Sequence, residues 1–266
     1  MRARVLVLSC LLATPALAAP KPDKKKAEIA QLAIILDGAD EDAAVKAAQA
    51  LGDMADPAAH DALLDGLAFG LPPLVAVDAM TALAKHPAPP DVSSLSRYAG
   101  HHNQKVRSKA IAALSLYPDP KAHAAVVAGL HDPAPGVREA AAQTAAKAHV
   151  REAVPALFEL LALGEEPAAH ALADLADADL VRKIGDQLGK VPDVTLALCL
   201  GLILRRPDFG PDTERVEVVR AIGKLQSPAA TDALTDYVNA TPKNPPRASR
   251  QEAEKMLEAR TSGAGK

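Results

Sequence analysis

Two stretches of the chain share one pattern at the same offsets, 63 residues apart. The first is Pro57-Ala-Ala-His-Asp-Ala-Leu-Leu-Asp-Gly-Leu67, and the second is Pro120-Lys-Ala-His-Ala-Ala-Val-Val-Ala-Gly-Leu130. Their apolar residues fall at i, i+1 and i+4, which is one face of a helix, so Leu63, Leu64 and Leu67 are expected to face the core. Asp precedes Pro at both starts, which predicts an N-cap followed by proline at the first helical position.

A second set of helical segments alternates with these stretches. Val75, Val106 and Val137 lie 31 residues apart, so the 63-residue match spans two repeats of about 31 residues. Residues 153–161 and 228–238 resemble further copies of the quoted stretch, and no window alternates with period two for long enough to predict a strand. A fixed period of this length is typical of repeat architectures. The sequence therefore predicts an all-α solenoid of stacked antiparallel helix pairs.

The composition agrees with this class and argues against others. Hydrophobic residues make up 49% of the chain, aromatic residues only 2%, and there is no Trp. An all-β sandwich needs β-branched and aromatic residues, whereas Ala and Leu favour helices. The formal net charge of −3 argues against sequence-independent nucleic-acid binding, which depends on neutralising phosphates. No nucleic-acid partner is therefore predicted.

The first 18 residues have the three parts of a secretory signal peptide. Arg2 and Arg4 are followed by an apolar core at residues 5–12 and by the cleavage site Ala16-Leu-Ala18. The apolar run is too short to span a bilayer, and no other stretch is long enough. We expect export to the periplasm or the extracellular space, a basic tether at 19–26, a solenoid at 27–260 and a flexible tail at 261–266. The alternative is a lipid-anchored envelope assembly factor, because residues 7–10 faintly resemble a lipobox ending at Cys10.

Two motifs link the repeats to a known family. Residues 132–141 read Asp-Pro-x-x-x-Val-Arg-x-x-Ala, and residues 154–161 read Val-Pro-x-Leu-x-x-Leu-Leu. This pattern resembles the short HEAT-like repeats of bilin (phycobilisome) lyase-type proteins. The resemblance implies helix pairs that stack into a continuous core and a curved rod. It also implies an alternative function, that of a lyase-type enzyme or an enzyme-assisting factor.

No catalytic, cofactor or metal site is predicted. His60 and His123 occupy matching positions two repeats apart, which places them on the order of 20 Å apart and too far to bind one ion. The sequence has no His-Glu-x-x-His, Cys-x-x-Cys, Gly-rich phosphate loop or Gly-x-Ser-x-Gly motif. Cys199 lies in an apolar helical run, which favours a buried structural thiol.

Two arginines recur at the repeat period. Arg107 and Arg138 each follow one of the periodic valines. The guanidinium group suits carboxylates and carbonyl oxygens. We expect a ladder in which each arginine binds an acid or backbone carbonyls of the adjacent unit.

The predicted function is that of an exported, non-catalytic scaffold that binds a protein or peptide through its concave face. The helices at 57–67, 120–130 and 153–161 and the helix at 228–238 are expected to line that face. The candidate partner-binding residues are charged positions on or directly beside these helices, together with two arginines elsewhere that interrupt the acidic set: Asp61, Asp65, Glu152, Glu159, Asp232 and Asp236, and Arg97 and Arg182. Most are acidic, which predicts a salt-dependent groove for a basic partner, while an ordinary solvated helix face is the alternative.

Overall fold

A computed structural model describes residues 24–263. Within this range the chain forms fifteen α-helices and two short 3-10 helices, with no strand. The elements are α1 (Lys24–Leu36), α2 (Glu41–Asp53), α3 (Pro57–Phe69), α4 (Pro73–Leu83), α5 (Asp91–Tyr98), α6 (Gln104–Ala113), η1 (Leu114–Leu116), α7 (Pro120–Gly129), α8 (Pro135–Lys147), η2 (Arg151–Ala153), α9 (Val154–Ala162), α10 (Glu166–Leu175), α11 (Ala178–Gly185), α12 (Asp193–Arg205), α13 (Asp212–Gly223), α14 (Pro228–Ala240) and α15 (Ala248–Gly263).

The expected boundaries differ slightly from the observed helix ends. The signal peptide at 1–18 lies outside the described residues, as does most of the tether at 19–26. Helix α1 begins at Lys24, so the last three residues of the expected tether are helical. Helix α15 continues to Gly263, three residues into the expected tail.

Local sequence explains where the helices begin. The Asp56 side chain accepts a hydrogen bond from the Ala58 N–H at 2.9 Å, and Asp119 accepts one from the Lys121 N–H at 2.7 Å. Both N-caps precede a proline at the first helical position, as predicted. Asp132 does not cap a helix in this way, because α8 begins three residues later at Pro135.

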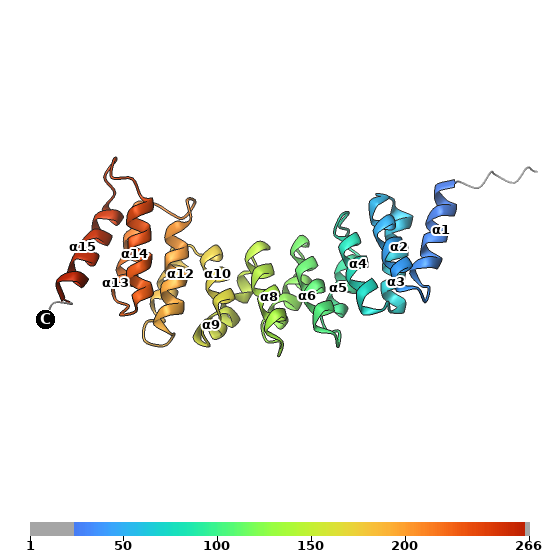
Figure 1. The fold of residues 1–266 in the computed structure, drawn as a ribbon, viewed down its shortest axis with the longest axis horizontal. Helices are drawn as coiled ribbons and strands as arrows, with labels where there is room; N and C mark the ends of the chain where they lie inside the picture. The colour runs from blue at the N-terminus through green and yellow to red at the C-terminus, as the bar shows by residue number, and fades with distance from the viewer. Residues whose placement is uncertain (1–23, 264–266) are drawn as a thin grey trace, which may run out of the picture.

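The helices form two layers that alternate along the chain (Figure 1). Consecutive even-numbered helices from α2 to α14 pack closely against one another, and consecutive odd-numbered helices from α1 to α13 pack more loosely. Small residues permit this approach, since a Cβ atom added to Gly52 would lie 2.5 Å from that of Ala82. A Cβ atom added to Gly201 would likewise lie 3.1 Å from the Cβ atom of Ala233. The even-numbered helices therefore form the more tightly packed of the two layers.

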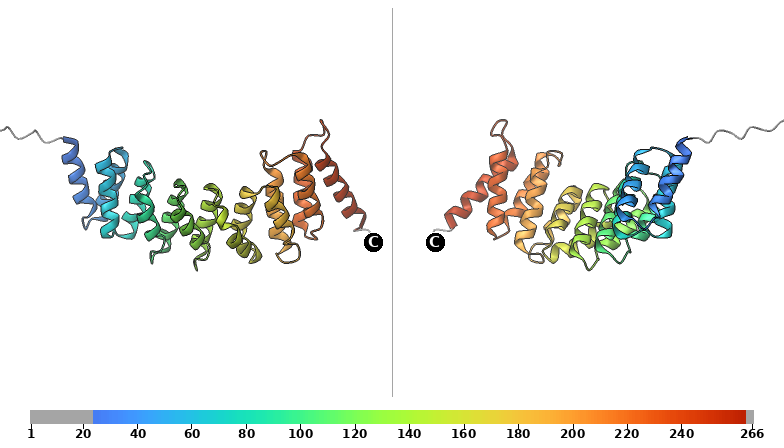
Figure 2. Two further views of the ribbon diagram at one scale, coloured as in Figure 1. Left: turned by 180° about the vertical axis from the view of Figure 1, so that it is seen from behind. Right: turned by 45° about the vertical axis from the view of Figure 1, so that its right-hand side comes forward.

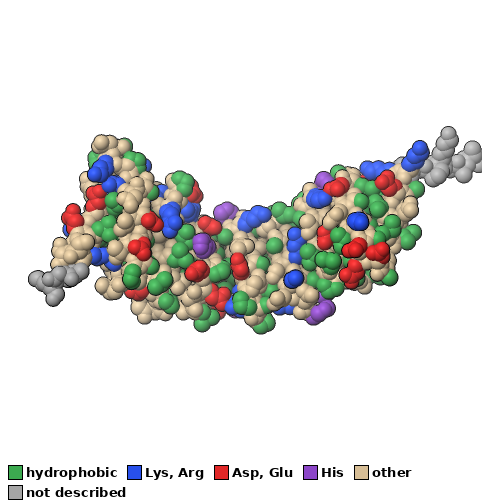
Figure 3. All heavy atoms as spheres, viewed as in Figure 1, with side chains coloured by type: hydrophobic (Ala, Val, Ile, Leu, Met, Phe, Trp, Pro, Cys, Tyr) green, Lys and Arg blue, Asp and Glu red, His purple; other side chains and the backbone are tan. Residues whose placement is uncertain are grey.

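The result is an elongated arc whose two ends rise toward the same side (Figure 2). In the space-filling view the upper edge of the arc is hollowed in the middle (Figure 3). We call the exposed surface of the even-numbered helices the inner face and that of the odd-numbered helices the outer face. None of the helices between residues 24 and 263 is long and apolar enough to cross a membrane.

The four matching copies do not share one layer. The helices α3, α7 and α9 belong to the odd-numbered layer. The copy at 228–238 forms α14, which packs between α12 and α15 and belongs to the even-numbered layer. In the structure α12 pairs with α13 and α14 pairs with α15, so this last copy is the first helix of its pair, whereas the other copies are the second. The expectation that all four helices line one face is therefore wrong.

Candidate protein-binding face and its supports

The predicted arginine ladder is present and joins adjacent repeats. Arg107 donates from Nε and Nη2 to the two carboxylate oxygens of Asp132, at 2.7 and 2.8 Å. Its Nη1 donates to the carbonyl oxygen of His101 at 2.9 Å. One repeat later, Arg138 binds the carboxylate of Glu165 at 2.5 and 2.9 Å and the carbonyl oxygen of Asp132 at 2.8 Å. Both arginines therefore have the structural role that the sequence predicted.

Two further arginines, Arg206 and Arg215, also bind backbone carbonyl oxygens of other segments, although they do not recur at the repeat period of 31 residues. Arg206 donates to the carbonyl oxygens of Ala173, Asp174 and Ala176, and Arg215 donates to that of Leu204. Their guanidinium groups lie 6.0 and 5.8 Å from the ring centre of Phe209, which is buried. These contacts order the linker between α12 and α13, where the sequence suggested only an irregular segment.

The first ladder pair predicts an acid-sensitive contribution to stability. The hydrogen bond from Arg107 holds the pKa of Asp132 below its ordinary value. A carboxyl whose pKa is lower in the folded state stabilises the fold above its unfolded pKa of about 3.9, and this is lost as the pH falls through the folded pKa. We expect Asp132→Asn to lower the free energy of unfolding by about 1.5–3 kcal/mol at neutral pH. Urea titrations at several pH values should show the difference from wild type shrinking below about pH 4.

The matched control is the exposed pair of Asp179 and Arg182 on α11, whose side chains are 78% and 70% exposed. Asp179→Asn should leave the urea midpoint unchanged at every pH, because exposed ion pairs contribute little. An Asp132→Asn variant whose loss stayed constant down to pH 3 would contradict the role of the carboxylate charge.

The structure also contains a polar cluster around one buried carboxylate, which the sequence analysis did not predict. Asp91, the first residue of α5, is fully buried. Its carboxylate contacts His60 Nε2 at 2.6 Å and accepts hydrogen bonds from the Tyr117 hydroxyl at 2.5 Å and the Ala88 N–H at 2.9 Å. One carboxylate thus ties together α3, α5, the loop before α5 and the segment after η1.

A sequence signal for this cluster existed. Asp91 follows His60 by 31 residues, which is one repeat, while the residue 31 positions after His123 is Val154. Accordingly, His123 Nε2 is buried without a hydrogen-bond partner. The two matching histidines therefore have different surroundings, and only the first belongs to a polar cluster.

The inner face carries a hollow between α4, α6 and α8 with a volume of about 720 Å³. Its apolar wall includes Leu74, which is 53% exposed, and Val77 and Val137. Lys105 and Lys109 lie on its α6 wall, one helical turn apart. This hollow combines an apolar floor with positive charge.

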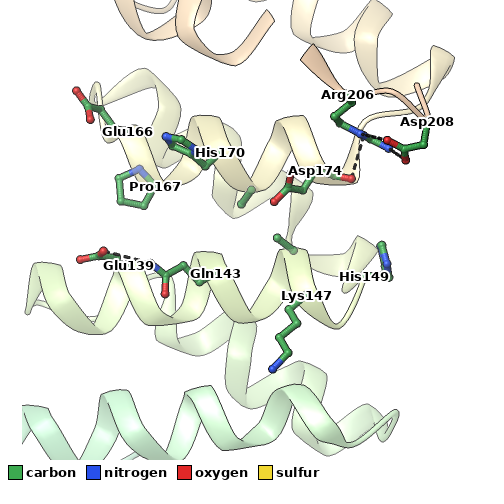
Figure 4. A pocket seen from close by; sticks show the side chains of 12 residues that line it. Glu139, Gln143, Lys147, His149, Glu166, Pro167, His170, Asp174, Arg206 and Asp208 are labelled. Atoms are coloured by element: carbon green, nitrogen blue, oxygen red, sulfur yellow. Dashed lines mark hydrogen bonds and ion pairs between the residues drawn. The ribbon is translucent and has the colours of Figure 1, made fainter. Parts of the chain in front are cut away.

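A second hollow, of about 770 Å³, lies on the inner face between α8 and α10 (Figure 4). Helix α10 contributes Glu166 and Asp174, and helix α8 contributes Glu139 and Lys147. In Figure 4 the two glutamates lie at the same end of the hollow, whereas Lys147 extends away from α10. Arg206 also lines this hollow, but its charge is compensated by Asp208 at 2.8 Å. The α10 side of the hollow is therefore acidic.

The eight predicted partner-binding residues do not share one face. All are exposed. Six belong to the outer layer: Asp61 and Asp65 on α3, Arg97 on α5, Glu152 on η2, Glu159 on α9 and Arg182 on α11. The other two, Asp232 and Asp236, lie on α14 in the even-numbered layer. The expected continuous acidic groove is not formed by these residues.

Several of these residues have local partners instead. Arg97 donates to the carbonyl oxygen of Leu67 at 2.6 Å and so fastens α5 to the end of α3. Glu152 and Glu159 lie 3.7 and 3.8 Å from ring nitrogens of His123 and His131. These contacts are those of solvated helix surfaces, which was the alternative interpretation.

Cys199 is a possible nucleophile by residue type, but its buried position keeps the thiol from reacting. It lies on α12, is completely buried, and burial raises the pKa of its thiol to about 12. Only the thiolate reacts with disulfide reagents. For the mature protein, from which Cys10 has been cleaved, we expect no reaction with 5,5′-dithiobis(2-nitrobenzoate) in the folded state and one equivalent after denaturation in guanidinium chloride. A fast reaction without denaturant would show that α12 is accessible.

Comparison with known proteins identifies the repeats. Residues 92–176 match the model of HEAT repeats, and residues 43–69 match that of the PBS lyase HEAT-like repeat. No curated protein matches the chain. Between residues 24 and 263, no group of three or more His, Cys, Asp or Glu side chains is placed to hold a metal ion.

Several solved structures resemble the chain at low identity. The complex of CpcE and CpcF of phycocyanin lyase from Nostoc sp. PCC7120 is 18% identical, covers 94% of this chain and 99% of that one, and gives a TM-score of 0.47. A Kap121p mutant is 13% identical, with 89% and 30% covered and a TM-score of 0.48. A designed armadillo repeat protein is 15% identical, with 87% and 99% covered and a TM-score of 0.39. At these identities the likeness is one of fold alone.

The family matches fall within the segments where the sequence motifs were strongest. Residues 43–69 include the first quoted stretch, and residues 92–176 include both the ladder arginines and the Val-Pro-x-Leu motif. The predicted resemblance to HEAT-type repeats is confirmed, because residues 43–69 and 92–176 of this all-helical solenoid match models of such repeats.

Proposed function

We propose that this protein is an exported, non-catalytic scaffold that binds another protein through its inner face. One observation carries the proposal, namely two adjoining hollows of about 720 and 770 Å³ that share α8 on the inner face. Together they extend over the four consecutive inner-layer helices from α4 to α10. A long surface on a rigid repeat scaffold suits an extended protein segment better than a compact small molecule.

Exposed apolar side chains on the same layer support this proposal. Leu74 is 53% exposed at the rim of the first hollow, and Val194 on α12 is 59% exposed. Exposed apolar groups beside charged ones are typical of surfaces that become covered by a partner. The arginine ladder and the Asp91 cluster hold the repeats in place, so the inner face is available without rearrangement of the helices.

Site-specific photo-cross-linking tests the binding face. The photoreactive residue p-benzoylphenylalanine replaces Gln104 or Gln143, which are exposed on the inner face, in the full-length protein in its native cells. Matched outer-face positions are Asp65 and Glu159, which are equally exposed. The proposal expects one defined protein adduct from the inner positions and none from the outer ones. Adducts only from the outer positions, or none from either face, would reject it.

Export rests on the N-terminal sequence alone, because residues 1–18 lie outside the described range. Sequencing the N-terminus of the mature protein should give a start at Ala19 or Pro20, since the apolar core and the small-x-small site predict cleavage there. A start at a lipid-modified Cys10 would favour the envelope lipoprotein instead. An intact Met1 would exclude both.

A second candidate function is that of a bilin-lyase-type enzyme or an enzyme-assisting factor. It is favoured by one observation, the match of residues 43–69 to the PBS lyase HEAT-like repeat. The match concerns a single repeat. Incubation of the purified protein with a free bilin, followed by absorbance spectroscopy, tests it, and an unchanged bilin spectrum would leave the scaffold as the remaining function.

A further inference from the structure

We propose that the inner face binds an extended partner segment with opposite charges at its two ends, with its acidic end over α6 and its basic end over α10. The inference rests on the proposed function and names the chemistry and orientation of the partner. It differs from the sequence prediction of a purely basic partner, because different residues form the surface.

The inner face changes charge along the rod. The side toward α6 carries Lys105 and Lys109, and Lys147 of α8 extends away from α10 (Figure 4). The side toward α10 carries Glu166 and Asp174. Helix α8 itself carries both Glu139 and Lys147, and it separates the lysines of α6 from the carboxylates of α10.

These charges are available to a partner. Within the described part of the chain, none of the three lysines and neither of the two α10 carboxylates makes an ion pair. The charged arginines nearby are already compensated, as Arg138 and Arg206 show. Charge complementarity mainly sets which partner binds and in which direction, since placing like charges together is costly. An inverted segment would place acids against α10 and bases against α6.

The apolar part of the first hollow lies beyond the α6 end of this surface. Leu74 and Val77 belong to α4, which packs against α6 on the side away from α10, and they offer a surface for one or two apolar side chains. Neighbouring helices are about 10 Å apart, so α6 and α10 are separated by about 20 Å across two steps. An extended chain advances about 3.3 Å per residue. The acidic and basic residues of the partner should therefore be about six positions apart, with apolar residues beyond the acidic end, over α4.

Selection from a random library of 12-residue peptides displayed on phage, with the full-length protein as bait, tests this inference. The selected peptides should carry acidic and basic residues about six positions apart. Synthetic copies should bind Lys105→Glu/Lys109→Glu and Glu166→Lys/Asp174→Lys at least about tenfold more weakly than wild type, by isothermal titration calorimetry. A photoreactive group at the acidic end should cross-link to α6, and one at the basic end to α10.

Two controls separate the charge effect from other causes. Asp61→Lys/Asp65→Lys reverses two charges on the outer face of α3 and should leave peptide affinity unchanged. Circular dichroism should show the same helix content for all variants. The variant in which all four inner-face charges are exchanged should reverse the cross-linking pattern, so that the acidic end reaches α10.

Selected peptides without separated charges, affinities that ignore the four substitutions, or a library that yields no inner-face binder would overturn the inference. These outcomes are distinguishable from failure of the proposed function. If the inner positions still cross-link to one protein in cells, the scaffold function holds and only the charge-directed orientation is wrong.

Discussion

Replacing Asp91 with Ala should lower the free energy of unfolding by about 3–5 kcal/mol. The carboxylate is fully buried and has three partners, His60, Tyr117 and the Ala88 N–H. Its removal leaves the buried Tyr117 hydroxyl and the part-buried His60 ring and Ala88 N–H without this hydrogen-bond partner, and each unsatisfied group costs free energy. Because Asp91 and its three partners come from four segments of the first three repeats, the loss affects the packing of α3, α5 and the segment after η1 together. Urea unfolding followed by circular dichroism measures the change.

The control for this prediction is Asp61→Ala. Asp61 follows His60 directly in the sequence but is exposed on the outer face. Its replacement should change the free energy of unfolding by less than about 0.5 kcal/mol. Losses of equal size for Asp91→Ala and Asp61→Ala would show that the buried cluster does not hold these repeats together.

The fold could be predicted because its signals are local. The period of 31 residues, the i, i+1, i+4 apolar spacing and the Asp-Pro caps each act within one helix or between neighbours. Asp56 and Asp119 therefore cap helices as expected. The layer to which a helix belongs depends on how many helices precede it. The unrecognised pairing of α12 with α13 consequently placed α14 in the wrong layer.

The candidate site could be predicted only in part, because some of its residues recur at the repeat period and others are brought together only by the packing of helices. The arginine ladder repeats at a fixed offset, so Arg107 and Arg138 were recognisable in the sequence. Asp91 was not, because its partner His60 lies one repeat away in another helix and no motif connects the two residues. The lysines Lys105 and Lys109 carry no motif. Their place in the hollow follows from the packing of α4, α6 and α8 against one another, and not from any single segment.

Leu63→Ala should lower the free energy of unfolding by about 3–5 kcal/mol, and Leu64→Ala should cost roughly half as much. The apolar pattern predicted that both side chains face the core, but Leu63 is 1% exposed whereas Leu64 is only partly buried. A fully buried leucine leaves a cavity when truncated, while a partly exposed one loses less apolar contact and lets water replace it.

The second copy of the stretch has the same pair of positions, one fully buried and one partly buried. The comparison can therefore be repeated within the same protein. Val126 is 1% exposed and Val127 is partly buried, at the positions that match Leu63 and Leu64. Val126→Ala should therefore cost more than Val127→Ala, with smaller values because less volume is removed. Urea unfolding of the four single variants measures both differences. Equal losses within each pair would mean that the odd-numbered helices are rotated about their axes relative to this structure, and the assignment of the outer face would then be wrong in both repeats.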